Sequence, residues 1–103
     1  MLISLEEAKK HLRVEHNADD EYILNLIIAA QDWAESFLNL KFLESETQEE
    51  NNDTENYLEV KEVHKMAMLL VIGSWYENRE NVSEKYVPYV ACSLLWPFRK
   101  VPV

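Results

Sequence analysis

The sequence predicts an all-α fold, a small four-helix domain with two long central helices and two short flanking helices. Three observations predict it. The 103-residue chain is 48% hydrophobic and contains only one glycine and three prolines, a composition typical of a globular domain. Apolar residues recur at helical spacing in four segments, and no segment shows a strand-like alternation. A chain of this length buries enough surface for one core, so residues 1–103 are predicted to form a single domain.

The first short helix is predicted over residues 5–13. The Ser4 hydroxyl is placed to accept a hydrogen bond from the amide of Glu7, and the Glu7 side chain is placed to reach back. This reciprocal pair is a capping box. The helix is expected to bury Leu5, Ala8 and Leu12.

The first long helix is predicted over residues 19–40. Its start carries negative charge from Asp19, Asp20 and Glu21, where the helix dipole favours it. Most of the circumference is apolar, so this helix is either central in the fold or also faces a neighbouring subunit. One narrow polar stripe remains at helical spacing: Asn25, Asp32, Ser36 and Asn39.

Residues 44–56 are predicted to form an exposed acidic loop between the two long helices. The segment contains six acids and no apolar residue. Such a composition cannot offset the entropy lost on ordering.

The second long helix is predicted over residues 58–81. Gly73 inside it costs about 1 kcal/mol relative to alanine, which suggests that another helix passes close at that point. The residues expected to be buried are Val60, Val63, Ala67, Leu70, Val71 and Trp75.

The last short helix is predicted over residues 89–96. Pro88 suits its first turn, and Pro97 stops it. Residues 97–103 are left as a C-terminal tail.

The charge excludes one class of partner. Nineteen acidic against ten basic side chains give a net charge of −9, which repels phosphate backbones and predicts no sequence-specific binding of nucleic acid. The same charge is compatible with a surface past which DNA slides.

The sequence also predicts that the protein is neither exported nor inserted into a membrane. Glu6 and Glu7 stand where a secretory signal needs basic residues, and the longest apolar run falls short of the ~20 residues that cross a membrane. The single cysteine, Cys92, lies in an apolar segment and is expected to be a small buried hydrophobe. A reducing cytoplasm fits best.

The sequence contains no recognisable catalytic, cofactor-binding or metal-binding motif. His11, His16 and His64 lack metal-ligand spacing and are interpreted as surface histidines. One glycine cannot build a phosphate loop, and most of the acids lie in solvated runs. An enzyme would require a pocket that unites His64, Tyr76 and Glu77.

The segment Trp75-Tyr76-Glu77-Asn78-Arg79-Glu80 stands out as a candidate partner anchor. Trp75 and Arg79 are four residues apart and share a helix face. Tryptophan, tyrosine and arginine are the residues that interfaces favour. The structural interpretation is a helix end whose aromatic residues pack in the core while its charges meet water.

The sequence resembles phage head-tail connector proteins, also called head-completion or adaptor proteins. The resemblance begins with the run from Leu5 to Val14 (LEEAKKHLRV), followed by Asp19-Asp20 and a long apolar helix. It continues with the Trp75–Glu80 segment, then Pro88, Leu94-Leu95, Pro97 and Arg99. The resemblance implies a candidate interface that consists of Trp75, Tyr76, Glu77, Asn78, Arg79, Glu80, Pro88 and Arg99.

The resemblance implies a structural role in virion assembly. Proteins of this kind form a ring, commonly a dodecamer, that docks beneath the portal protein at the capsid vertex and lets DNA pass through. A tail-completion or stopper protein binds below. The expected locations are the host cytoplasm during assembly and the head–tail junction of the virion. The alternative is a small helical adaptor or regulatory module that works as a monomer or dimer.

Overall fold

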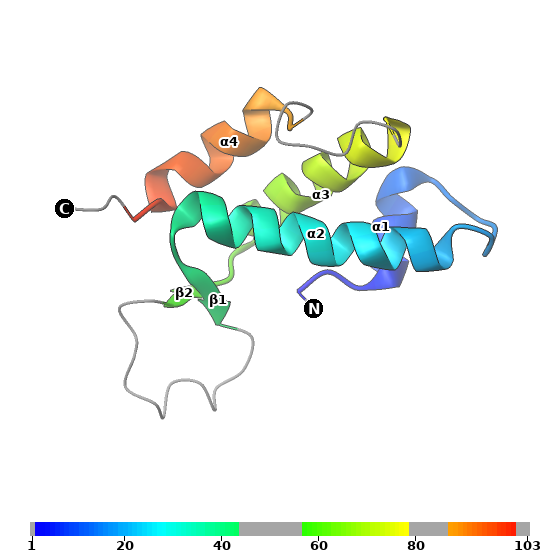
Figure 1. Ribbon diagram of the computed structural model, residues 1–103, viewed down its shortest axis with the longest axis horizontal. Helices are drawn as coiled ribbons and strands as arrows, with labels where there is room; N and C mark the ends of the chain where they lie inside the picture. The colour runs from blue at the N-terminus through cyan, green and yellow to red at the C-terminus, as the bar shows by residue number, and fades with distance from the viewer. Residues whose placement is uncertain (1, 44–56, 79–86, 101–103) are drawn as a thin grey trace.

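The computed structural model of the protein describes residues 2–43, 57–78 and 87–100. In these residues the chain forms four α-helices, a pair of short strands and a final 3-10 turn (Figure 1). The predicted four-helix fold is confirmed, and the strand pair is an addition to it. In chain order the elements are α1 (Leu5–Leu12), α2 (Asp20–Leu38), β1 (Lys41–Leu43), β2 (Tyr57–Glu59), α3 (Glu62–Glu77), α4 (Tyr89–Leu95) and η5 (Trp96–Phe98).

The capping box predicted for α1 is present. The amide of Glu7 donates to the Ser4 hydroxyl at 3.1 Å, and the amide of Ser4 donates to the Glu7 carboxylate at 3.4 Å. Arg13 adopts a left-handed conformation, with φ 60°, and ends the helix one residue before the predicted boundary. Of the residues expected inside, Ala8 is buried, whereas Leu5 and Leu12 pack against the core with part of their surface exposed.

Helix α2 ends at Leu38, two residues before the predicted boundary. Asn39 takes up a left-handed conformation, with φ 58°, which asparagine tolerates better than most residues, and the chain turns there into β1. The predicted polar stripe is confirmed, because its four residues are all exposed. The opposite face of α2 lies in the core: Ile23, Leu26, Ile27, Ala30, Ala34 and Leu38.

The expectation that the chain contains no strand is wrong. Strands β1 and β2 pair in parallel, with Phe42 opposite Leu58, and Phe42 is only 2% exposed. Residues 58–59, predicted as helix, lie in β2 because Leu58 covers the end of the core beside Phe42. The predicted acidic loop, residues 44–56, lies outside the described residues.

Helix α3 contributes the second half of the core and contacts both α2 and α4. It begins at Glu62, four residues later than predicted, and ends at Glu77, before the predicted boundary at residue 81. Ala67, Val71 and Trp75 are buried as predicted, whereas the other three expected core residues, Val60, Val63 and Leu70, remain partly exposed.

Another helix does pass close to Gly73, as predicted. A Cβ atom placed on Gly73 would lie 3.5 Å from Nε2 of His11, which belongs to α1. That separation is an ordinary van der Waals contact, so α1 approaches α3 here without requiring a glycine.

Helix α4 begins at Tyr89, as predicted, with Pro88 at the N-cap position rather than in the first turn. It ends at Leu95, one residue before the predicted boundary, and Pro97 lies within the 3-10 turn that follows. The amide of Lys100 donates to the carbonyl of Leu38 at 2.8 Å, and Asn39 Nδ2 donates to the carbonyl of Lys100 at 3.0 Å. Residues 97–100, predicted as tail, are therefore fixed to the C-terminal end of α2.

Within the described ranges, no helix has both the length and the apolar character needed to cross a membrane.

Candidate assembly surface

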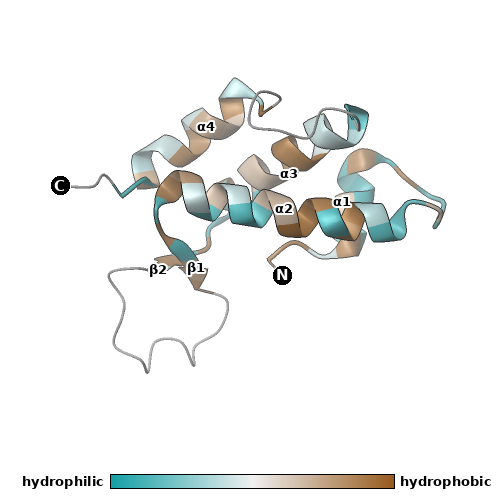
Figure 2. Ribbon diagram, viewed as in Figure 1, coloured by the Kyte–Doolittle hydropathy of each residue, from teal (hydrophilic) through white to brown (hydrophobic). Residues whose placement is uncertain are grey.

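Helix α4 and the turn after it are apolar on the side that faces solvent. Residues 87–98 include no charged side chain, and Figure 2 shows α4 without the strong teal that interrupts α1 and α2. The inner face buries Ala91 and Leu95, yet Tyr89 is 85% exposed, Val90 56% and Trp96 60%. A surface helix normally carries polar residues on its outer face, so this side of α4 is suited to contact with another protein.

A row of aromatic rings continues this surface onto α2. The Phe37 ring stacks on Trp33 with 5.4 Å between centroids and lies 6.3 Å from Trp96. The Arg99 guanidinium lies over two of these rings, 5.2 Å from the Phe37 centroid and 5.4 Å from that of Trp96. These cation–π contacts fix the positive charge of Arg99 beside the aromatic residues.

Two adjoining hollows mark this surface. The first is lined by Phe37, Tyr89, Cys92, Ser93, Trp96 and Pro97, and the second by Trp33, Ser36, Phe37, Val87, Cys92 and Arg99. The first contains no charged residue, whereas the second contains the charge of Arg99. We call the surface formed by Phe37, Tyr89, Val90, Cys92, Trp96 and Arg99 the aromatic patch.

Cys92 was expected to be a small buried hydrophobe, but it is only partly buried. Its side chain is partly exposed and lines both hollows, because Cys92 lies on the edge of α4 that faces Phe37. Partial burial raises the pKa of the thiol, so the group stays protonated at neutral pH.

A second exposed surface lies on the outward side of α2. Ile28 is 50% exposed in the middle of the polar stripe, with Glu21 and Asn25 before it and Asp32 after it on the same side of the helix. Among the described residues, neither the Glu21 nor the Asp32 side chain makes a hydrogen bond or ion pair, whereas the Asp20 side chain pairs with Lys9 at 2.8 Å. We call Glu21, Asn25, Ile28 and Asp32 the Ile28 face.

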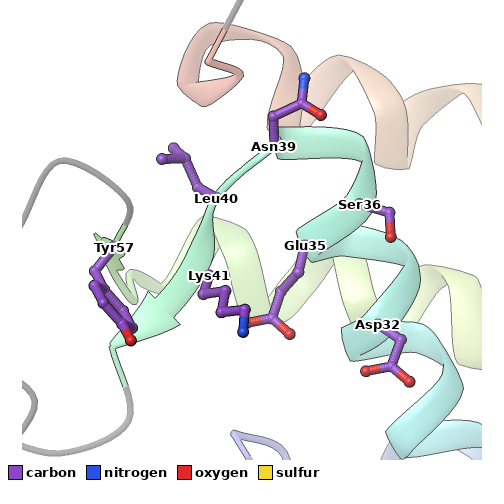
Figure 3. A pocket seen from close by; sticks show the side chains of 7 residues that line it. All are labelled: Asp32, Glu35, Ser36, Asn39, Leu40, Lys41 and Tyr57. Atoms are coloured by element: carbon purple, nitrogen blue, oxygen red, sulfur yellow. The ribbon is translucent and has the colours of Figure 1, made fainter. Parts of the chain in front are cut away.

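An open hollow adjoins the C-terminal half of α2 (Figure 3). Glu35 is held there, because its carboxylate accepts a hydrogen bond from the amide of Phe42 at 2.7 Å and so ties α2 to β1. The lining is polar and mixed in charge, which suits contact with a protein surface. It consists of Asp32, Glu35, Ser36, Asn39, Leu40, Lys41 and Tyr57.

Comparison with known families decides what kind of protein has these surfaces. The family model described as phage gp6-like head-tail connector protein matches residues 2–93. The chain belongs to this family. No curated protein and no solved structure matches the chain. The resemblance found in the sequence is confirmed, and the connector is a structural component of a phage virion rather than an enzyme.

The candidate interface residues of the connector do not form one surface. Trp75 is 4% exposed and belongs to the core. The Tyr76 hydroxyl donates to the Asp19 carboxylate at 2.5 Å, and Asn78 Nδ2 donates to the carbonyl of Ser74 at 2.8 Å. Of this segment, therefore, Trp75, Tyr76 and Asn78 hold the connector's own fold together.

The remaining candidates lie in different parts of the chain. Glu77 is exposed at the end of α3, whereas Arg79 and Glu80 lie outside the described residues. Pro88 precedes Tyr89 at the start of α4, and Arg99 forms part of the aromatic patch.

Sequence reasoning missed Ile28, Phe37, Tyr89 and Trp96. The signal that could have revealed the last two is the absence of any charge from residues 87–98 in a chain whose residues are 28% charged.

The pocket that an enzyme would require does not form in the connector. His64 lies in the first turn of α3, whereas Tyr76 and Glu77 lie in its last turn. Twelve residues of helix separate His64 from Tyr76, which is about 18 Å along the axis. The described residues include no group of histidine, cysteine or acidic side chains that could hold a metal ion.

His64 was expected at the surface, and this is wrong. It is fully buried, because it lies one helical turn before Ala67 and Met68 on the core face of α3. Its Nδ1 accepts a hydrogen bond from the amide of Lys61 at 3.0 Å, and the ring of Phe98 lies 4.4 Å away. Burial lowers the pKa of His64, and the nearby Lys61 charge lowers it further. His11 and His16 are exposed as expected.

Proposed function

We propose that the connector is a subunit of a ring that docks beneath the portal protein at the capsid vertex and forms part of the DNA passage. Family membership supports a role in joining head and tail. The observation that supports assembly into a ring is the aromatic patch. Its large apolar side chains are exposed in the single chain, and assembly with another protein would remove them from water.

The charge of the chain supports the passage of DNA. A net charge of −9 disfavours adhesion of a phosphate backbone to the ring. DNA would move past such subunits without being held.

The proposed partners follow from the proposed position. The portal protein lies above the ring, and a tail-completion or stopper protein lies below it. The ring is a dodecamer, the stoichiometry that the sequence resemblance implies. The connector is made in the host cytoplasm and ends at the head–tail junction of the virion.

Sedimentation with capsids tests this role. The purified connector is mixed with capsids that contain the portal and, as the matched control, with capsids of the same phage that lack it. We expect the connector to sediment only with portal-bearing capsids, in several copies per capsid. Equal binding to both capsids, or binding of only one or two copies, would contradict the proposal and favour an adaptor that works as a monomer or dimer.

A further inference from the structure

We propose that the Ile28 face of one connector subunit docks onto the aromatic patch of the next subunit. This inference rests on the proposed ring and names the two surfaces that join its copies. The occupant of the aromatic patch is thus a second copy of the same chain. The contact is head-to-tail, since each copy offers the Ile28 face to one neighbour and the aromatic patch to the other.

The two surfaces share no residue, and they adjoin where Asp32 lies one helical turn before Ser36, which lines the second hollow. The Ile28 face occupies residues 21–32 of α2, whereas the aromatic patch lies on α4, η5 and the last turns of α2. Each includes a large exposed apolar side chain, 50% exposed at Ile28 and 60% at Trp96. Polar and charged residues surround Ile28, whereas Trp96 lies among aromatic and apolar residues with the charge of Arg99 beside it.

Charge complementarity favours this pairing. Residues 19–40 include five acids and no basic residue, whereas residues 87–100 include two basic residues, Arg99 and Lys100, and no acid. On the Ile28 face, Glu21 and Asp32 have no charged partner among the described residues. Opposite charges that meet across an interface set its orientation and suppress alternative contacts.

Each surface also places an apolar position next to a charged one. Ile28 and Asp32 are four residues apart on α2, so their Cβ atoms lie about 5–6 Å apart on one side of the helix. The aromatic patch has two adjoining hollows that share Phe37 and Cys92, one apolar and one containing Arg99. Ile28 enters the apolar hollow while Asp32 reaches the Arg99 guanidinium.

Arg99 is prepared for such a carboxylate. Its guanidinium stacks on Phe37 and Trp96, and within the described residues its buried Nε has no hydrogen-bond acceptor. Stacking uses the face of the guanidinium and leaves its N–H groups directed sideways. Because Nε itself is buried, an incoming carboxylate would accept hydrogen bonds from the terminal N–H groups of Arg99.

Met66 is the other large exposed apolar residue on a described long helix, and it suits the aromatic patch less well than Ile28 does. Met66 on α3 is 49% exposed, but the acid on its side of the helix is Glu62, and Lys65 is its immediate neighbour. A lysine that approaches Arg99 would be repelled. Met66 therefore serves as a control position of matched exposure.

Disulfide crosslinking tests the contact, because the chain has one native cysteine and it lies in the proposed docking site. In the Ile28→Cys variant, the new thiol should meet Cys92 of the next copy. The variant is assembled on portal-bearing capsids and oxidised with copper phenanthroline. We expect a ladder of dimers, trimers and higher species on a non-reducing gel, because every copy both gives and receives one crosslink.

Three controls accompany this experiment. Met66→Cys has the same number of thiols at a site of equal exposure and should give no ladder. Ile28→Cys combined with Cys92→Ser should give none either. The native protein should stay monomeric on the gel. The number of copies at the vertex is counted by electron microscopy for each variant.

The outcomes separate this inference from the ring itself. A full ring at the vertex with no Ile28–Cys92 ladder would overturn the inference and leave the ring intact. Dimers without higher species would also overturn the inference, because they indicate a two-fold contact. A crosslink from Ile28→Cys to the portal protein would overturn it as well. So would a ladder from Met66→Cys. Absence of the native connector from the vertex would refute the ring and the inference together.

Charge exchange gives a second, independent measurement. Asp32→Lys places like charges together and should reduce the number of copies per capsid at least about tenfold, and Arg99→Glu should reduce it similarly. The double variant restores an opposite pair and should bind more copies than either single variant. A double variant no better than the weaker single variant would contradict the contact.

Discussion

At the scale of single residues, His64 links the protonation state of the connector to its stability. Neutral His64 accepts the hydrogen bond from the amide of Lys61 at the start of α3. Protonation of Nδ1 would remove that acceptor and place a charge among Phe42 and Phe98, whose ring centroids lie 5.6 and 4.4 Å away. The fold therefore favours the neutral form.

Acidification should destabilise the connector through this residue. The pKa of folded His64 lies below its value of 6.5 in the unfolded chain, so the unfolded state binds the proton first as the pH falls. The contribution is fully present above about pH 6.5 and is lost as the pH falls through the folded pKa. We expect the melting temperature to decrease from pH 7.5 to 5.5. His64→Gln should show a flatter profile, and equal profiles would contradict this role.

Two tryptophans should separate folding from assembly. Trp75 is buried, so Trp75→Ala should lower the free energy of unfolding by about 3–5 kcal/mol. Trp96 is exposed, so Trp96→Ala should change it by about 1 kcal/mol or less while reducing the number of copies on capsids. Urea denaturation and capsid sedimentation measure the two effects. Similar losses of stability in both variants would argue against the aromatic patch.

Arg79, which lies outside the described residues, remains a candidate for partner binding. If it holds a partner, Arg79→Ala should abolish capsid attachment and leave the melting temperature near that of the native protein. A large decrease in melting temperature would instead assign Arg79 to the fold.

At the scale of elements, the sequence predicts the helices well because their signals are local. The Ser4–Glu7 capping box predicted where α1 begins, and the helical spacing of polar residues predicted the exposed stripe of α2. The left-handed Asn39 shortened α2, although asparagine after a helix is itself a recognised stop signal. The β1–β2 pair was missed because each strand is three residues long and pairing across residues 44–56 leaves no local periodicity.

Gly73 offers a test at this scale. Because a Cβ atom at this position makes only ordinary contacts with His11, Gly73→Ala should gain helix propensity without a clash. We expect the free energy of unfolding to rise by about 0.5–1 kcal/mol, measured by urea denaturation. A loss of stability would mean that α1 packs on α3 more tightly than the 3.5 Å separation indicates.

At the scale of the whole molecule, the assembly surface could be predicted only in part. The apolar excess of α2 indicated either a central helix or a neighbouring subunit, and Ile28 at its surface is consistent with both. Trp75 was a candidate interface anchor, with packing in the core as the structural interpretation, and the fold buries it. Which side of a helix remains exposed depends on packing between distant elements, and the sequence of one segment does not contain that information.

The central claim is that the connector forms a ring at the head–tail junction. Electron microscopy of the portal vertex, on capsids assembled with and without the connector, tests it most directly. We predict an additional ring of density beneath the portal, with a central opening wide enough for duplex DNA, only when the connector is present. Capsids that bind the connector elsewhere, or vertices that look the same with and without it, would contradict the claim.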